Sequence, residues 1–256
     1  MISLVHAFSF YPAIFVVMAI FRLPKTIRWI VVCAILLLIL LTAYRYCINL
    51  LFPNLFAGIK TGLGNAFWYG LRFDVRIVGG LTLLMFLLSF YPGKHYFRSE
   101  EGKKVALWVY GFFITMILVF YAADIAYLRN FNQRLNSSII SDLAKNTEKG
   151  IVFKTKTEWL AITGTMIAVI VFFILLANKL HGFITNMKGS GNTGKRITWQ
   201  VITIIVCVLA MYGSFTLKPL SVSTAASRLT AAQLALALNP FEALFNTLPE
   251  RRTGSQ

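Results

Sequence analysis

The sequence predicts an all-α, polytopic membrane protein with five core transmembrane helices and an extra apolar segment before them. Of its 256 residues, 57% are hydrophobic and only 13% are charged, whereas a soluble domain has about 25% charged residues. The charges are also unevenly placed. Blocks of roughly 20 residues have few or none, and a block of this length can cross a bilayer.

The basic excess indicates the partners. The 25 lysines and arginines, against 9 acidic residues, gather mainly between the apolar blocks, where they act as topology signals and contact lipid headgroups. No basic helix face or stacking module accompanies them, so we expect the lipid bilayer and no nucleic acid as a partner. The three cysteines and three histidines give neither a disulfide framework nor a metal-ligand spacing.

Six apolar blocks follow one another, and the last five form the predicted core: residues 2–21, 29–52, 71–91, 105–123, 159–178 and 197–217. The first block contains His6 and Pro12, and has three interpretations: a true span, an interfacial helix, or a mis-called start before Met18. Arg45 interrupts the second block, and charges stand at the head of the third. We divide the chain into an extra apolar segment, a transmembrane domain and juxtamembrane helices or linker, at residues 1–21, 22–217 and 218–256.

The connections between blocks predict the orientation. Three of them carry three, four and four basic residues: residues 22–28, 94–104 and 179–196. The positive-inside rule places these connections in the cytoplasm and the C-terminus outside. We therefore expect a multi-pass protein of the bacterial cytoplasmic membrane. The connection at 124–158 fits less well, because it would lie outside and yet carries six basic residues.

Two further segments predict helices at the outer membrane surface. Residues 49–70 mix large apolar residues with glycine, proline and lysine, and Trp68 and Tyr69 suit the headgroup level. Near the C-terminus, a short helix is predicted over residues 224–238. Asn239 ends this helix and caps the next one, in which Pro240 takes the first position.

The stretch FWYGLRFDVR (67–76) puts three charges at the head of the third block. In a helix, Arg72 and Arg76 share a face because they are four residues apart. Asp74 then points away from both and needs a partner on another element. Asp124 marks the tail of the fourth block, which reaches the same side of the membrane, so we expect it to pair with Arg72 or Arg76.

Asp74 is in turn expected to pair with Arg129 or Arg134, in the connection after Asp124. Two interpretations remain: the charges only fix the packing of two spans, or the surplus arginines bind an anionic phospholipid headgroup. Four arginines against two aspartates favour headgroup binding, whereas pairing is the commoner fate of such charges. The candidate outer-leaflet cluster comprises Arg72, Asp74, Arg76, Asp124, Tyr127, Arg129, Arg134 and Asn136.

Three short motifs carry a resemblance to a known family. They are GLRFD (70–74), the pattern D-x-x-Y-x-R-x-x-x-x-R-L-N (124–136) and LNP (238–240). Together they resemble the membrane half of the bacterial lipoteichoic-acid-synthase-like sulfatases, of the alkaline phosphatase superfamily, over most of residues 27–248. The resemblance implies five spans and a large extracytoplasmic domain. In that domain, a threonine nucleophile and a divalent metal carry out phosphoglycerol transfer or ester hydrolysis.

The nucleophile and metal ligands of that domain have no counterpart in this sequence, so we expect no catalytic residue, metal or cofactor here. The resemblance implies a membrane anchor and lipid-headgroup-binding domain that works with its own or a separate extracytoplasmic catalytic domain. Residues 248–256 have no structure-closing feature, which favours a piece of a longer enzyme over a free-standing module.

Two alternatives stay open. The first is a small transporter or non-enzymatic membrane scaffold. The second is a relative of the phosphoethanolamine transferases, which also anchor an outer catalytic domain by five spans. A transporter requires internal repeats or broken helices near the midplane. The sequence shows no repeat, and Gly79–Gly80 is its one candidate break.

Overall fold

The computed structural model describes residues 23–56, 59, 62–90, 96–97, 99–136, 156–187, 193–213 and 219–247. All regular structure in these ranges is helical, which confirms the all-α class. The helices are α2 (Lys25–Leu51), α3 (Leu63–Leu88), α4 (Glu100–Phe131), α6 (Lys156–Asn186), α7 (Thr193–Tyr212), α8 (Val222–Ala226), α9 (Ala231–Ala237) and α10 (Pro240–Thr247). The apolar block at 2–21 and the C-terminal residues 248–256 lie outside the described ranges.

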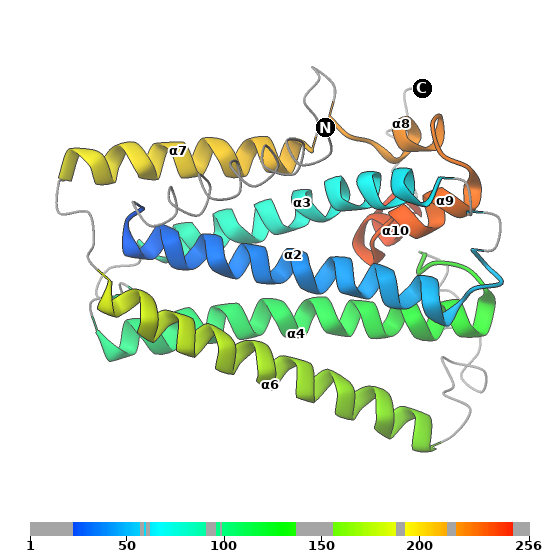
Figure 1. Ribbon diagram of the computed structural model, residues 1–256, viewed down its shortest axis with the longest axis horizontal. Helices are drawn as coiled ribbons and strands as arrows, with labels where there is room; N and C mark the ends of the chain where they lie inside the picture. The colour runs from blue at the N-terminus through cyan, green and yellow to red at the C-terminus, as the bar shows by residue number, and fades with distance from the viewer. Residues whose placement is uncertain are drawn as a thin grey trace, which may run out of the picture.

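Five long helices run back and forth along the longest axis of the molecule, and three short helices gather at one end (Figure 1). The long helices have 20 to 32 residues, or about 30–48 Å at 1.5 Å per residue. We call the end that carries α8, α9 and α10 the cap end. We call the opposite end the basic end, because it carries Lys25, Lys103, Lys104, Lys195 and Arg196.

Four of these helices are long and apolar enough to cross a membrane: α2, α4, residues 160–186 of α6 and residues 194–212 of α7. They coincide with four of the five predicted core spans and are compatible with a membrane-embedded, multi-pass protein. The remaining predicted span corresponds to α3, whose first half carries Arg72, Asp74 and Arg76. The charge-free remainder of α3, residues 77–88, is shorter than a bilayer requires by itself.

Helix α3 begins earlier than the sequence predicts, at Leu63 rather than at residue 71. The interpretation of residues 49–70 as one interfacial segment is therefore wrong for its second half. The reason is burial at helical spacing: Ala66, Tyr69 and Phe73, three and four residues apart, lie on one buried face of the helix. This face packs against apolar residues of α8 and α9 as well as of α2.

The core between α2, α3, α4 and α6 centres on Trp29, whose side chain is fully buried in α2. Its ring makes edge contacts with Tyr96, Tyr110 and His181, at centroid distances of 5.6, 6.2 and 5.9 Å. These three rings come from the α3–α4 connection, α4 and α6. One large aromatic residue therefore joins several elements near the basic end.

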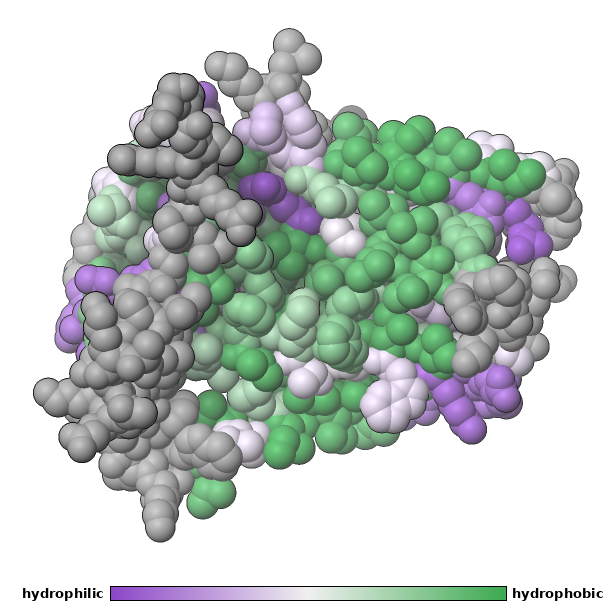
Figure 2. All heavy atoms as spheres, turned by 180° about the vertical axis from the view of Figure 1, so that it is seen from behind, coloured by the Kyte–Doolittle hydropathy of each residue, from purple (hydrophilic) through white to green (hydrophobic). Residues whose placement is uncertain are grey.

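Large apolar side chains cover the outside of α4, α6 and α7. Trp108, Phe112, Leu160, Phe172 and Leu209 are 59% to 80% exposed. Soluble monomers rarely expose contiguous apolar patches of this extent. Figure 2 shows hydrophobic surface over the middle of the helices on one face, and hydrophilic surface gathered mainly toward their ends. This distribution suits a bilayer as the surrounding solvent.

Gly79 and Gly80, the candidate break, do not interrupt α3, which is continuous from Leu63 to Leu88. A Cβ atom at position 79 would lie 2.8 Å from the Cβ atom of Ala210 in α7. The glycine therefore lets α7 pack closely on α3, which is a usual role of small residues between membrane helices.

Candidate functional site

The predicted charges of α3 lie at the cap end, where α9 and α10 cover the ends of the long helices (Figure 1). They point in different directions, as their spacing predicts. Asp74 is directed toward α2, whereas Arg72 and Arg76 both reach the C-terminal end of α7. The face shared by the two arginines and the separate face of Asp74 are thus confirmed.

Asp74 pairs with Arg45 of α2. Nη1 and Nη2 of Arg45 donate to Oδ2 and Oδ1 of Asp74, at 2.7 and 3.0 Å, a bidentate geometry that fixes both groups. Arg45 is 3% exposed and Asp74 is fully buried, so each charge depends on the other. Gly70 makes room for the pair, because a Cβ atom there would collide with the guanidinium group of Arg45.

Two arginines also bind the C-terminal end of α9. The Nε and Nη2 atoms of Arg45 donate to the carbonyl oxygens of Leu236 and Ala237, at 3.2 and 3.3 Å. Nη1 of Arg134 donates to the carbonyl oxygen of Ala235, at 3.0 Å. Terminal helix carbonyls lack partners within the helix and carry partial negative charge. The arginines thus dock this short helix onto α2 and the end of α4.

Asp124, fully buried near the end of α4, holds the segment after this helix. Its Oδ2 atom lies 3.0 Å from Nη2 of Arg134 and accepts a hydrogen bond of 2.7 Å from the hydroxyl of Tyr44. Its Oδ1 atom accepts from the backbone N–H of Leu135, at 2.8 Å. Asn132, with φ of 53°, ends α4 in a left-handed conformation that turns the chain so that Arg134 returns to Asp124.

Arg72 and Arg76 hold the chain after α7. Nε of Arg72 donates to the carbonyl oxygen of Gly213, at 3.1 Å, and its guanidinium lies 5.3 Å from the centre of the Tyr69 ring. Arg76 donates to the carbonyl oxygens of Met211 and Leu220, at 3.2 and 2.9 Å. It thereby bridges the end of α7 and the segment that leads into α8.

Arg76 also forms an ion pair with Glu242 of α10, with 2.9 Å between Nη1 and Oε1. Burial raises the pKa of Glu242, and the nearby Arg76 opposes this shift. The ionised carboxylate is therefore less favourable in this site than in water. The pair orients α10 more than it stabilises it.

Asn239 joins α10 to the Arg45–Asp74 pair. Its Oδ1 atom accepts from the backbone N–H of Glu242, at 2.9 Å, so its predicted role as the N-cap of the last helix is confirmed. Its Nδ2 atom donates to Oδ1 of Asp74, at 3.3 Å. One buried side chain thus starts α10 and ties it to α3.

The single helix predicted over residues 224–238 is wrong, because the segment forms α8 and α9. The cause is a capping box at the start of α9. The hydroxyl of Thr230 accepts from the backbone N–H of Gln233, and the Gln233 side chain accepts from the backbone N–H of Thr230. This reciprocal pair begins a new helix at Ala231.

The predicted ion pairs are also wrong. Asp74 binds Arg45 rather than Arg129 or Arg134, because the buried face of α3 is turned toward α2. Asp124 binds Arg134 rather than Arg72 or Arg76, because both of these face α7. Of the other predicted members, Tyr127 donates to Asn136 at 3.1 Å, and Arg129 lies exposed in the last turn of α4.

The sequence did not predict that Arg45, Tyr44 and Glu242 belong to the site. It predicted Asn239 as a helix cap but not as a partner of Asp74. Arg45 left a signal, because it is the one charge inside the second apolar block and so needs a partner within the protein. The helical spacing of Asp74 requires a partner on another element, and Arg45 meets that requirement. Tyr44 and Glu242 carry no comparable signal in a single sequence.

We give the name cap-end cluster to the paired side chains at this end of the helices: Arg45, Asp74, Arg76, Asp124, Arg134, Asn239 and Glu242. The chemistry of this cluster favours binding and positioning over reaction. Each of its three carboxylates is paired with an arginine. These pairings hold the carboxylates within the protein and leave none of them free to act as an acid or base on a bound substrate. Within the described ranges, no group of three or more histidine, cysteine or acidic residues is placed to hold a metal ion. The Tyr121 hydroxyl and the Nε atom of Arg134 are buried and have no hydrogen-bond partner among the residues that the structure describes, so the site has donor capacity left within those residues.

Comparison of the chain with protein-family models, with curated proteins and with solved structures finds no match.

Proposed function

We propose that this chain is the membrane-anchoring domain of a lipoteichoic-acid-synthase-like phosphoglycerol transferase or sulfatase. One observation supports this proposal above the others. The three motifs that carry the family resemblance are far apart in the sequence, yet Asp74, Asp124 with Arg134, and Asn239 all belong to the cap-end cluster. A shared structural role gives a physical reason for these motifs to occur together.

In this proposal the cap-end cluster is a rigid mount, by which we mean that it holds the short helices in a fixed position on the long ones. The long helices cross the bacterial cytoplasmic membrane five times, with α3 as the fifth span. Three arginines fix α9 and α10 to the ends of these helices. A catalytic domain joined to this end, or a separate catalytic partner docked there, is then held at a defined height above the outer leaflet. The divalent metal belongs to that catalytic domain.

The distribution of charge supports an extracytoplasmic cap end. Exposed lysines and arginines gather at the basic end of the helices, among them Lys104 and Arg196, where the positive-inside rule predicts the cytoplasm. At the cap end, Arg45, Arg76 and Arg134 are occupied by carboxylates and backbone carbonyls. These arginines therefore contribute little free positive charge to the surface on that side.

Arg72 is the residue of the cap end that we propose to bind a lipid headgroup. It is half-buried near the end of the apolar region, and only its Nε atom has a hydrogen-bond partner among the described residues. Its two terminal nitrogens are suited to bind a phosphate oxygen of an anionic phospholipid in a bidentate manner. Arg76 and Arg134 are committed within the protein, so headgroup binding is confined to fewer arginines than the sequence predicts.

Reporter fusions test the orientation. Alkaline phosphatase is active only outside the cytoplasm, and a fluorescent protein exported in unfolded form is dark there. We expect phosphatase activity and no fluorescence for fusions after residue 247, and the reverse for fusions in the connection at 188–192. A fluorescent fusion after residue 247 would contradict an extracytoplasmic cap end.

Native mass spectrometry of the detergent-purified chain with phosphatidylglycerol tests headgroup binding. We expect Arg72→Ala to reduce the bound fraction and the exposed Arg129→Ala to reduce it less. Lys25→Ala, at the other end of the helices, serves as the control. Unchanged lipid retention in both arginine variants would remove headgroup binding from the proposal and leave the anchor.

The alternative of a small transporter finds less support. Helices α2, α3 and α4 are continuous over their described lengths, and transporter sites are usually built on broken helices near the midplane. A non-enzymatic scaffold would use the same mount. An enzyme anchor differs from a scaffold in the domain that it holds at the cap end, so co-purification of a phosphatase-superfamily domain with the chain favours the enzyme anchor.

A further inference from the structure

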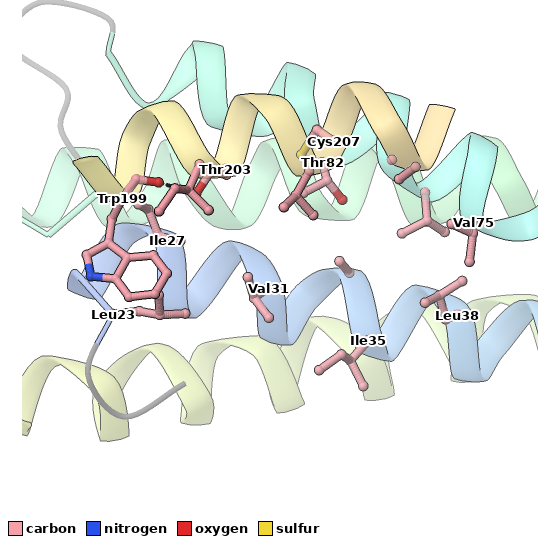
Figure 3. Close-up of a pocket in the computed structure, with 16 residues that line it drawn as sticks. Leu23, Ile27, Val31, Ile35, Leu38, Val75, Thr82, Trp199, Thr203 and Cys207 are labelled. Atoms are coloured by element: carbon pink, nitrogen blue, oxygen red, sulfur yellow. Dashed lines mark hydrogen bonds between the residues drawn. The ribbon is translucent and has the colours of Figure 1, made fainter. Parts of the chain in front are cut away.

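An apolar groove of about 290 Å³ runs between α2 and α7, and α3 forms its floor (Figure 3). Its walls are the sides of two helices that both pack on α3. Residues three, four or seven apart line each wall, which is the spacing of one helix face. They include Ile27, Val31 and Leu38 on α2, and Trp199, Val206 and Cys207 on α7.

The groove spans about three helical turns. From Ile27 to Leu38, and likewise from Trp199 to Ala210, its length is about 17 Å at 1.5 Å per residue. Its polar members on the floor and wall are Thr82 and Thr203, and the hydroxyl of Thr203 is bound to the carbonyl oxygen of Trp199 at 2.7 Å. The groove therefore offers an elongated apolar surface with no charge.

The chain enters the described structure at one end of this groove. Leu23, the first described residue, is 8% exposed and lines the groove, and α2 begins two residues later at Lys25. A helix that ended near residue 21 would be joined to α2 by a very short connection. Short connections place consecutive helices side by side and antiparallel.

The other flanks of α2 near this entry are already covered. Trp29, Cys33 and Leu37 face the core. On the α6 side, Lys25 donates to the carbonyl oxygen of Thr185 at 2.6 Å, and Trp29 donates to that of Ala177 at 3.5 Å. Among the described residues, the groove is the side of α2 near this entry that stays open to an antiparallel neighbour.

We propose that residues 2–21 form a further membrane helix that lies along this groove, antiparallel to α2. Twenty residues span about 30 Å as a helix, which is enough to cross the hydrocarbon core. Because the helix would turn back at residues 22–24, residues 9–20, SFYPAIFVVMAI, would lie opposite the groove. This stretch has no charge and matches the apolar walls, and Cys207 would face its middle.

Disulfide scanning in the full-length chain tests this occupant. In a Cys33→Ala, Cys47→Ala background, Cys207 is the one remaining native thiol, and a second cysteine replaces each of residues 9–18 in turn. Oxidation in membranes is followed by gel mobility and mass spectrometry of the linked peptides. We expect intramolecular disulfides with Cys207 that recur every three or four positions, because one helix face meets α7.

The matched control keeps Cys47 instead of Cys207. Cys47 is exposed near the far end of α2, away from the groove, and should give no disulfide with residues 9–18. The absence of a Cys207 disulfide at every position would overturn the proposal, as expected if lipid chains fill the groove. Disulfides that form only between two differently tagged copies would also overturn it, because a second copy would then be the occupant.

Discussion

The two ends of the helices hold their cations in different ways. At the cap end, Arg45, Arg76 and Arg134 pair with carboxylates of other segments at 2.7–3.0 Å. At the basic end, Lys25 donates to a backbone carbonyl of α6, and the ion pairs that join described residues all lie at the other end. Charge at the cap end therefore fixes which segments meet, whereas in the proposed topology the charge at the basic end mainly sets the orientation in the membrane.

The largest effect should follow from breaking the buried pair at the cap end. Asp74→Leu leaves Arg45 buried without its carboxylate, and we expect it to lower the free energy of unfolding by about 3–5 kcal/mol. Lys25→Met removes a cation at the basic end and should cost no more than about 1 kcal/mol. Unfolding in mixed micelles by titration with dodecyl sulfate measures both. Equal losses would show that the two ends do not differ.

Gly70→Ala disturbs the Arg45–Asp74 pair at the cap end without changing any charge. The new methyl group must displace the Arg45 guanidinium from Asp74 and from the end of α9, so we expect a loss of about 1–3 kcal/mol. Gly64→Ala is the matched control in the same helix, because a Cβ atom there has no neighbour within 4 Å. It should be neutral or slightly stabilising. Thermal unfolding of the two detergent-solubilised variants should separate them, and similar midpoints would count against a packed Arg45.

Two substitutions at Asn239 separate its role as the N-cap of α10 from its hydrogen bond to Asp74. Asn239→Ala removes both and should cost about 1–2 kcal/mol. Asn239→Ser keeps an oxygen for the N-cap and loses the Nδ2 donor, so it should recover part of this loss. Protease cleavage after α10 in native membranes reports how firmly the helix is docked. Cleavage at the wild-type rate in the alanine variant would show that Asn239 does not hold α10.

The smallest effect is expected at Glu242. Its raised pKa means that the folded state favours the protonated form, so its contribution is largest at low pH and is lost as pH rises through that raised value. Glu242→Gln keeps a neutral side chain at every pH and should change stability by no more than about 0.5 kcal/mol at neutral pH. Unfolding midpoints of both proteins at pH 5 and 8 measure this. A wild type that gains stability over the variant as pH rises would contradict the sign.

Local periodicity predicts much of this fold. The apolar blocks place the long helices, the spacing of Arg72, Asp74 and Arg76 separates their faces, and Asn239 before Pro240 marks a helix start. Each of these features depends on residues within a few positions of one another. They could therefore be obtained from one sequence.

The partners in the cap-end cluster could not be obtained in the same way. The predicted topology places several arginines at the same end of the helices as Asp74, so it does not decide which of them is its partner. The choice of Arg45 depends on how α3 is rotated toward α2. That rotation follows from burial of Ala66, Tyr69 and Phe73 against α9 and its neighbours. The earlier start of α3 and the capping box of α9 belong to the same tertiary arrangement, which overrides the composition of residues 49–70 and 224–238.

A double-mutant cycle on Arg45 and Asp74 tests most directly whether a mutual, buried ion pair fixes the cap end. Arg45→Leu, Asp74→Leu and the double variant are compared with the unmodified chain by dodecyl sulfate titration. We expect each single substitution to be more damaging than the pair, with a coupling energy of about 2–3 kcal/mol, because the double variant leaves no buried charge unpaired. Losses that simply add would contradict the pairing.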